Sequence, residues 1–198
     1  MHIQAISAAL FTIAGLASAG PISERQAACS SYTIINTRGT GEAQGQSAGF
    51  RTMNSRITSQ VSGGKIYNTV YPAGINQDSS AGTKDIIDKI TTTLASSPNE
   101  CFILEGYSQG AAATVNALPS LTGNSFSAVK GVFLIGDPEH KSGLTCNVDN
   151  NGGTTTRNVN GLSATSSQGI PSNWISKTLD VCIFVSKASA PRASYFLM

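Results

Sequence analysis

A serine stands at the centre of the pentapeptide GYSQG, residues 106–110, between an apolar stretch and an alanine-rich one. Small residues on either side of a serine permit a tight strand-to-helix turn, which lifts the hydroxyl clear of the sheet. The backbone N–H of Gln109 would then point to where negative charge develops during acyl transfer, and the helix that follows would add its dipole. The pattern predicts a nucleophile at Ser108 and an oxyanion-hole donor at Gln109.

A serine hydroxyl is a poor nucleophile unless a neighbouring base takes its proton. The chain contains only two histidines, His2 and His140, and neither lies where such a base is expected. In folds with this serine turn, the acid and then the histidine follow the serine along the chain. The position of the base is therefore the main question that the sequence raises.

The elements that must position the serine alternate in type. Strand-like apolar runs lie at 31–42, 65–74, 101–108 and 128–140, and helical spacing of apolar residues occurs over 49–61, 79–98 and 109–121. Residues 143–169 are polar without periodicity and are predicted to form a long loop, and 170–184 holds the last recognisable strand. This alternation predicts one α/β domain, a three-layer α/β/α sandwich around a parallel sheet.

The first 19 residues resemble a secretory signal. Residues 5–16 form a short apolar core, and Ala17-Ser18-Ala19 offers small residues for cleavage. We therefore expect a secreted, extracellular protein, with an N-terminal arm at 20–28. No other segment is long enough to cross a bilayer, so no membrane partner is expected.

Charge and cysteines narrow the function classes further. The net charge of +2 and the lack of a basic cluster argue against a nucleic-acid partner. No cofactor or metal is predicted: "GTGEAQG" lacks the ending of a phosphate loop, and the cysteines have no zinc-ligand spacing. Four cysteines suit an oxidising compartment and predict one or two disulfides, with three pairings possible: Cys29, Cys101, Cys146 and Cys182.

Four motifs together resemble the cutinase and acetylxylan esterase family of small secreted α/β-hydrolases that lack a lid. They are "RGTGE", "GYSQGA", "IGDPEHKSGLTCN" and "LDVC", and they span roughly residues 29 to 184. The resemblance implies a serine esterase in which Thr40 supplies a second oxyanion donor beside Gln109. It also implies a disulfide between Cys29 and Cys101.

The resemblance ends abruptly after Cys182. Members of the family continue with a Gly-Asp, another cysteine and a later histidine before a last helix, whereas this chain continues "IFVSKASAPRASYFLM". By this alignment Asp180 is a solvated loop or strand-end aspartate, and His140 is a satisfied or exposed loop histidine. We treat residues 185–198 as a divergent tail and hypothesise a retained intron, because the codons of Val185-Ser186-Lys187 can begin like a splice donor.

These patterns predict a secreted, monomeric serine esterase that acts on a cutin-like polyester, short acyl esters or acetylated xylan through an acyl-enzyme at Ser108. Because the acid and the histidine are missing, we expect this chain to be severely impaired. An oxyanion hole alone retains about 10³–10⁴-fold catalysis over water. The alternative is a non-catalytic secreted relative that binds cell-wall polymer. Cys182 would lose its family partner and could pair with Cys146 or remain free.

Overall fold

The computed structural model describes residue 29 and residues 31–183. The predicted signal (1–19), arm (20–28) and divergent tail (185–198) lie outside the described residues. Within the described part, none of the helices is long and apolar enough to span a membrane.

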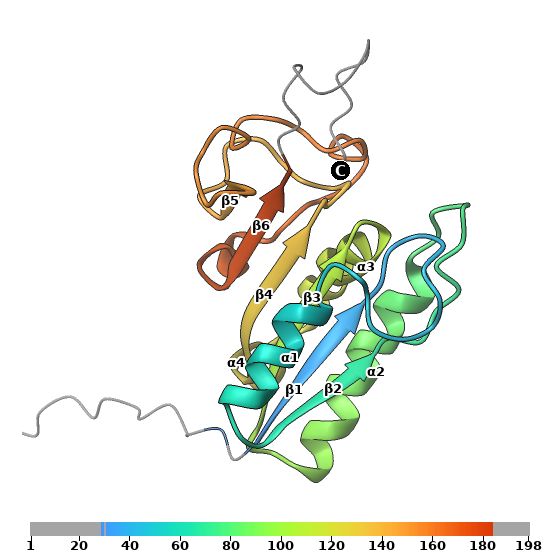
Figure 1. Ribbon diagram of the computed structural model, residues 1–198, viewed down its shortest axis with the longest axis vertical. Helices are drawn as coiled ribbons and strands as arrows, with labels where there is room; N and C mark the ends of the chain where they lie inside the picture. Colours follow the sequence, from blue (N-terminus) through green and yellow to red (C-terminus); the bar gives the residue numbers. More distant parts are fainter. Residues whose placement is uncertain (1–28, 30, 184–198) are drawn as a thin grey trace, which may run out of the picture.

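A single parallel sheet of six strands organises the described residues (Figure 1). Its order is β2-β1-β3-β4-β6-β5, so β3 lies between β1 and β4. Strand β3 leads into the sharp strand-to-helix turn at Ser108, which we call the elbow. The strands are β1 Ser31–Thr37, β2 Gly64–Asn68, β3 Glu100–Tyr107, β4 Val129–Ile135, β5 Asn147–Asp149 and β6 Thr178–Cys182. This arrangement confirms the predicted α/β fold with a central parallel sheet.

Helices cover both faces of the sheet because the chain reverses its direction across the sheet after β2. A right-handed connection from β1 outward to β2 and another back to β3 place their helices on opposite faces. Figure 1 shows α1 in front of the sheet and α3 behind it, and α2 packs against α3. The helices are α1 Arg51–Gln60, α2 Ser80–Ser96, α3 Gln109–Ala117 and α4 Gly123–Ala128, with 3₁₀ turns η1 Leu118–Ser120 and η2 Ser172–Lys177.

A buried polar network lies between α1 and the sheet. The Glu105 carboxylate, which is fully buried on β3, accepts hydrogen bonds from Asn36 Nδ2 at 2.7 Å and Asn54 Nδ2 at 2.9 Å. Asn36 Oδ1 in turn accepts a hydrogen bond from the Ser47 N–H at 2.8 Å. The network ties β1, β3, α1 and the preceding loop together three residues before Ser108.

One strand and one α-helix of the described chain were not predicted from the sequence. Strand β5 lies inside the segment 143–169 that was predicted to be a loop, and this prediction was wrong for Asn147–Asp149. The three residues pair with β6, and Asp149 and Asn147 make side-chain hydrogen bonds to the turn around them. Helix α4 contains no apolar periodicity because it is less than two turns long.

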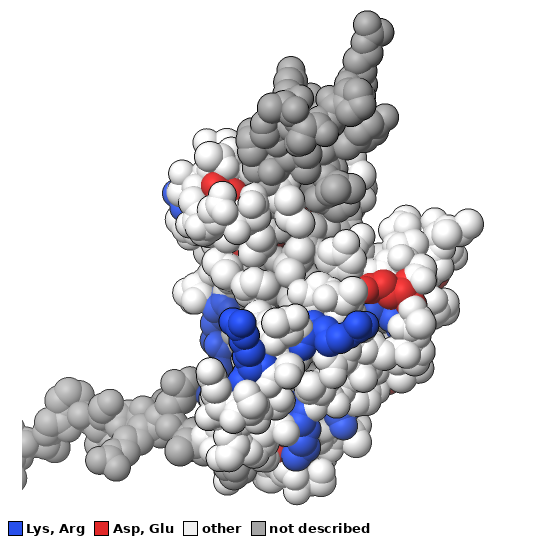
Figure 2. All heavy atoms as spheres, viewed as in Figure 1, with Lys and Arg blue, Asp and Glu red and all other residues white. Residues whose placement is uncertain are grey.

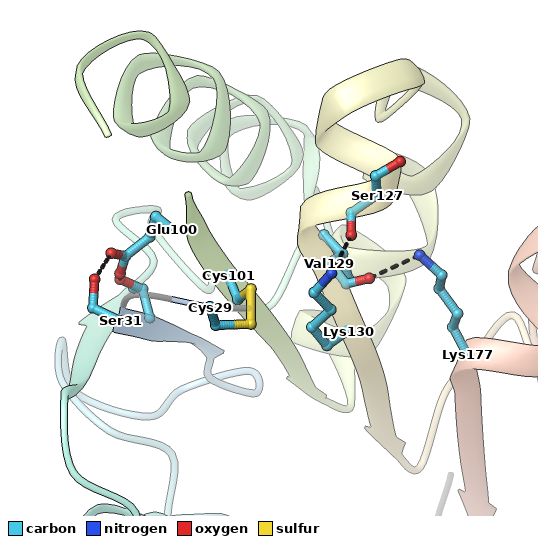
Figure 3. The surroundings of a disulfide bond; sticks show 9 residues. Cys29, Ser31, Glu100, Cys101, Ser127, Val129, Lys130 and Lys177 are labelled. Carbon is cyan, nitrogen blue, oxygen red and sulfur yellow. Dashed lines mark hydrogen bonds between the residues drawn. A yellow bond between two sulfur atoms is a disulfide. The ribbon is translucent and has the colours of Figure 1, made fainter. Parts of the chain in front are cut away.

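Cys29 and Cys101 form a disulfide that fastens the start of the described chain to β3 (Figure 3). Beside it, Glu100 accepts hydrogen bonds from the hydroxyls of Ser31 and Thr33. These contacts anchor the first strand to its neighbour at the end of the sheet that is remote from the elbow.

The other two cysteines, Cys146 and Cys182, are buried free thiols. Burial raises the pKa of Cys146 to about 11 and also raises that of Cys182. Both thiols are therefore protonated near neutral pH, which lowers their reactivity.

Charged side chains are sparse on the face drawn in Figure 2. Lys and Arg side chains gather around α1, whose Arg51 and Arg56 are exposed, and most of the remaining visible surface is uncharged. On this face the few positive charges give a weak field rather than a continuous basic surface.

Candidate active site

Ser108 forms the turn between β3 and α3 by itself. Its backbone has φ 53° and ψ −120°, in a region that residues other than glycine rarely adopt. The Ser108 N–H donates to the Ile135 carbonyl at 2.9 Å, and its own carbonyl accepts the Ala111 N–H at 2.8 Å. The end of β4 and the first turn of α3 thus hold the strained residue in place.

The two glycines of the pentapeptide are required by close backbone approach. A Cβ at Gly106 would lie 2.5 Å from Cα of Ala111, and one at Gly110 would lie 2.2 Å from the Thr37 carbonyl oxygen. Real Cβ atoms do not come so close to backbone atoms. Only glycine at both positions lets α3 turn back against β3 and pack on the end of β1.

The loop after β1 packs against Tyr107, the residue that precedes Ser108. Gly39 packs on the Tyr107 ring, where a Cβ would lie 2.7 Å from a ring carbon. The Arg38 guanidinium donates to the Glu42 and Tyr71 carbonyls and lies 4.9 Å from the centre of the Tyr71 ring. These contacts fix the loop that carries Thr40.

Thr40, Ser108 and Gln109 line one pocket of about 330 Å³. The pocket lies at the carboxyl ends of the strands, where open parallel sheets bind ligands. The predicted nucleophile and both predicted oxyanion donors are therefore brought together. The whole lining is Thr40, Gln77, Ser79, Ser108, Gln109, Ala112, Pro138, Glu139, Leu162 and Ser163.

The sequence reasoning missed Gln77, which orients Thr40. The Gln77 amide donates from Nε2 to Thr40 Oγ1 at 3.0 Å, and Thr40 Oγ1 lies 3.2 Å from Gln77 Oε1. Gln77 has φ 60°, so it is one of three non-glycine residues with positive φ in the described chain. The turn around Asn76 was the only sequence signal. The Gln109 side chain points elsewhere, because its Nε2 donates to the Gly74 carbonyl at 3.1 Å.

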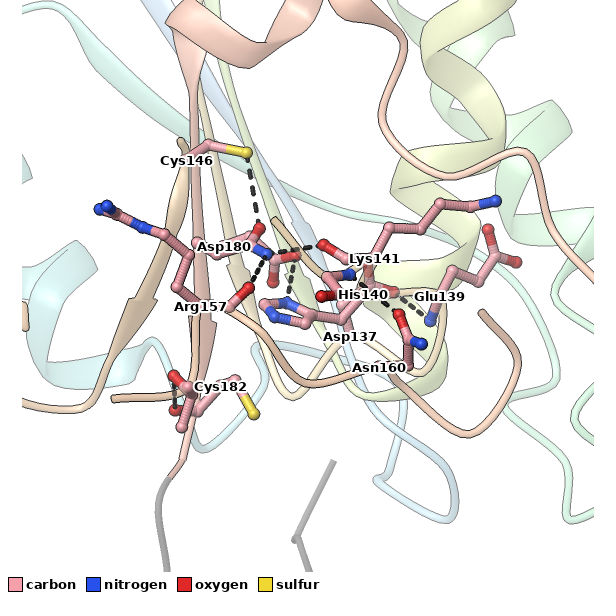
Figure 4. Close-up of polar contacts among 12 residues, drawn as sticks. Asp137, Glu139, His140, Lys141, Cys146, Arg157, Asn160, Asp180 and Cys182 are labelled. Carbon is pink, nitrogen blue, oxygen red and sulfur yellow. Dashed lines mark hydrogen bonds and ion pairs between the residues drawn. The ribbon is translucent and has the colours of Figure 1, made fainter. Parts of the chain in front are cut away.

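His140 and Asp180 form a buried pair (Figure 4), and neither residue is among those that line this pocket. His140 Nδ1 lies 2.6 Å from Asp180 Oδ2, and both side chains are fully buried. The interpretation of Asp180 as a solvated aspartate was wrong, because its side chain points from β6 into the interior and hydrogen-bonds to the imidazole. His140 is satisfied on Nδ1, whereas its Nε2 has no hydrogen-bond partner among the described residues.

A second carboxyl group adjoins the pair. Burial, with the charge of Asp180 adding to it, raises the pKa of Asp137 well above its ordinary value. Burial also raises the pKa of Asp180, and the hydrogen bond and charge of His140 partly offset this effect. The segment 137–140 thus turns Asp137 and His140 inward and places Pro138 and Glu139 on the wall of the Ser108 pocket.

The only titratable side chain among the described residues that line the Ser108 pocket is Glu139. Glu139 was not predicted as a site residue, because its place on the pocket wall depends on the turn at 137–140. No group of three His, Cys, Asp or Glu side chains within the described ranges is arranged to hold a metal ion. The site's own chemistry is that of a serine hydroxyl with backbone and side-chain donors around it.

Comparison with known proteins finds cutinases and a carboxylesterase among the similar proteins. The cutinase family model matches residues 28–185. The cutinase of Botryotinia fuckeliana is 30% identical over 145 residues, which cover 69% of this chain and 71% of that protein. A carboxylesterase of Mycobacterium tuberculosis is 35% identical over 117 residues, or 56% of this chain, and the match spans only 52% of that protein's length.

Solved structures agree in fold. A cutinase-like protein from Cryptococcus sp. is 68% identical, with a TM-score of 0.77 and coverage of 79% of this chain and 78% of that one. The catalytic core of an acetyl xylan esterase from Trichoderma reesei is 26% identical, with a TM-score of 0.62 and coverage of 78% and 83%. The serine elbow, the sheet order and these matches lead to one conclusion: the chain belongs to the cutinase family.

Proposed function

We propose that this chain is a secreted carboxylic ester hydrolase whose nucleophile is Ser108. The observation that carries the proposal is the strained elbow, which presents Ser108 in one pocket with Thr40 and Gln109. Attack of Ser108 Oγ on an ester carbonyl would form an acyl-enzyme and release the alcohol, and water would then release the acid. The ester is a cutin-like polyester, a short acyl ester or acetylated xylan, and the protein acts as a monomer.

The oxyanion of the tetrahedral intermediate would lie between the Gln109 N–H, at the start of α3, and the Thr40 loop. Preorganised donors of this kind contribute about 2.7–4 kcal/mol each in well-studied hydrolases. The Gln77 amide donates from Nε2 to Thr40 Oγ1, and in this arrangement the Thr40 hydroxyl proton is left to be donated to the oxyanion. We assign these residues as stabilisers of developing charge.

No histidine is among the described residues that line the pocket, so proton removal from Ser108 lacks its usual agent. We propose that turnover of this chain is correspondingly slow and rests on the oxyanion donors. The same observation favours a second candidate function, in which the pocket binds cell-wall polymer without cleaving it.

A fluorophosphonate probe separates the two functions because it labels only an activated serine. Labelling is measured by mass spectrometry, together with hydrolysis of 4-nitrophenyl butyrate, for the wild type and for Ser108→Ala. The matched control is Ser62→Ala, an exposed serine between α1 and β2. Loss of both signals in Ser108→Ala alone supports the esterase. Equal rates in the wild type and in Ser108→Ala refute it and leave the binding function.

A further inference from the structure

The dipeptide Asn-Gly occurs twice in the chain, at Asn151-Gly152 and at Asn160-Gly161. A polypeptide can change its own covalent structure at such a pair, because glycine has no side chain to keep its backbone nitrogen away from the preceding carboxamide. Both pairs lie in the long segment between β5 and η2. The fold surrounds them in different ways, so they should differ in reactivity.

The reaction requires only the two residues and water. The glycine nitrogen attacks the side-chain carbonyl carbon of the asparagine, and the new C–N bond closes a succinimide ring. The side-chain nitrogen leaves as ammonia and takes the proton of the glycine N–H. One water then opens the ring: attack at the side-chain carbonyl gives aspartate, and attack at the main-chain carbonyl gives isoaspartate.

Asn151 and Gly152 are exposed at the tip of the turn that follows β5. The Gly152 N–H donates to the Asp149 carbonyl at 2.9 Å, and this hydrogen bond must open before the nitrogen can attack. A Cβ placed at Gly152 would meet no atom within 4 Å, so only its chain neighbours surround this glycine. Opening of an exposed turn of this kind costs little free energy.

The second pair is held in place by the surrounding structure. Gly161 is buried, and its N–H donates to the His140 carbonyl at 2.7 Å. A Cβ at Gly161 would lie 2.3 Å from the Pro138 carbonyl oxygen, which leaves no room for a succinimide ring. Asn160 Oδ1 accepts the Ser142 N–H at 2.9 Å, so the carboxamide is held as well (Figure 4). Reaction here requires this packed contact to open as a whole.

We infer that Asn151 is a site of spontaneous modification by water, which converts its carboxamide to aspartate or isoaspartate, and that the fold protects Asn160 from the same reaction. Either product adds one negative charge to the turn after β5. The inference depends on neither the nucleophile nor the substrate of the proposed esterase.

The modification would disturb the contacts that anchor β5. Asp149 Oδ1 accepts the N–H groups of Asn151 and Gly153 at 2.9 and 2.8 Å, and its Oδ2 accepts the Thr155 hydroxyl at 2.6 Å. Isoaspartate adds a methylene to the main chain inside this set of contacts, and either product brings a second carboxylate close to Asp149. Because β5 has three residues and lies at the sheet edge (Figure 1), its pairing with β6 should weaken.

The test compares the two pairs in the folded and the unfolded chain. The full chain is held at mildly alkaline pH with and without urea, in water enriched in heavy oxygen, and is then digested and followed by mass spectrometry. Converted peptides carry the heavy oxygen because water opens the ring. In the folded protein Asn151 should convert at least about tenfold faster than Asn160. In urea the two rates should be similar, since the packing around Asn160 is then lost.

Asn151→Gln is the matched variant, because glutamine closes the corresponding ring far more slowly. It should abolish conversion of that peptide and leave Asn160 unchanged. Similar rates at the two pairs in the folded protein, or conversion of Asn151 in urea only, would overturn the assignment.

Hydrogen exchange tests the effect on the strand. The modified and unmodified forms of the folded wild type differ in charge and are separated by ion exchange. The amides of β5 should exchange faster in the isoaspartate form, whereas those of β1, which lies two strands from β6 in the sheet, should not. Equal exchange of β5 in both forms would refute the weakened pairing with β6.

Discussion

Glu105 makes the free energy of unfolding depend on pH in a direction that can be measured. Burial raises its pKa from 4.5 to about 6, although the amides of Asn36 and Asn54 favour the charged form. A folded-state pKa above the unfolded value means that the folded protein binds the proton more tightly. The contribution of Glu105 to stability is therefore fully present below about pH 4.5 and is lost as the pH rises through about 6.

The magnitude follows from the difference between the two pKa values. A rise from 4.5 to about 6 corresponds to about 2 kcal/mol at 1.36 kcal/mol for each pH unit. Glu105→Gln removes this titration but keeps one oxygen to accept the two amide hydrogen bonds. Because the pKa values of Asp137, Asp180 and Glu139 are also raised, the wild type contains other contributions of the same sign.

The informative quantity is thus the difference between two pH profiles. The free energy of unfolding is measured by urea titration between pH 4.5 and 7.5 for the wild type, Glu105→Gln and the exposed-carboxylate control Asp88→Asn. Over this range the wild type and the control should lose about 2 kcal/mol more than Glu105→Gln. Parallel profiles for Glu105→Gln and the wild type would show that the folded protein does not hold Glu105 at a raised pKa, and the reasoning would fail.

Three further changes test other parts of the structure. Gly110→Ala places a Cβ 2.2 Å from a backbone oxygen of β1 and should cost about 1–3 kcal/mol or more by denaturant unfolding, whereas Gly131→Ala on β4 meets no atom within 4 Å and should not. Cys101→Ala opens a loop of 72 residues and should lower the free energy of unfolding by about 4 kcal/mol. Reduction of the wild type should cause a similar loss, and no loss in either case would contradict the disulfide. Asp180→Asn weakens the buried hydrogen bond to His140 Nδ1 and should cost about 1–3 kcal/mol, while Asp88→Asn at an exposed pair should cost less than about 1 kcal/mol. Equal effects would contradict the assignment of a buried pair.

The parallel sheet and its helices could be predicted because their signals are local and strong. Continuous apolar runs such as Val129–Ile135 and the helical spacing in α2 report burial directly. The elbow could be predicted for the same reason, since the glycines at 106 and 110 reflect backbone approaches that exclude a side chain. Such patterns involve residues that are close together in the sequence, so they can be read from the sequence directly.

The features that were missed depend on residues far apart in the chain. Strand β5 is three residues long and exists through its pairing with β6, about 30 positions later. Asp180 has an ordinary strand-end sequence, and only the fold brings it to His140, 40 positions earlier. Such details depend on packing between residues that are far apart in the chain, which cannot be predicted from a single sequence.

The sheet order has a consequence for how the chain folds. Among the described residues β6 is the last strand in sequence, yet it lies between β4 and β5, so neither of those strands can complete its pairing before β6 is made. Until residues 178–182 leave the ribosome, β4 is an open edge and β5 has no partner within the sheet. Pairings that close so late are slow and expose apolar strand edges to other chains. Synthesis that pauses shortly before β6 would therefore leave a species prone to aggregation, even though the elbow would already be complete.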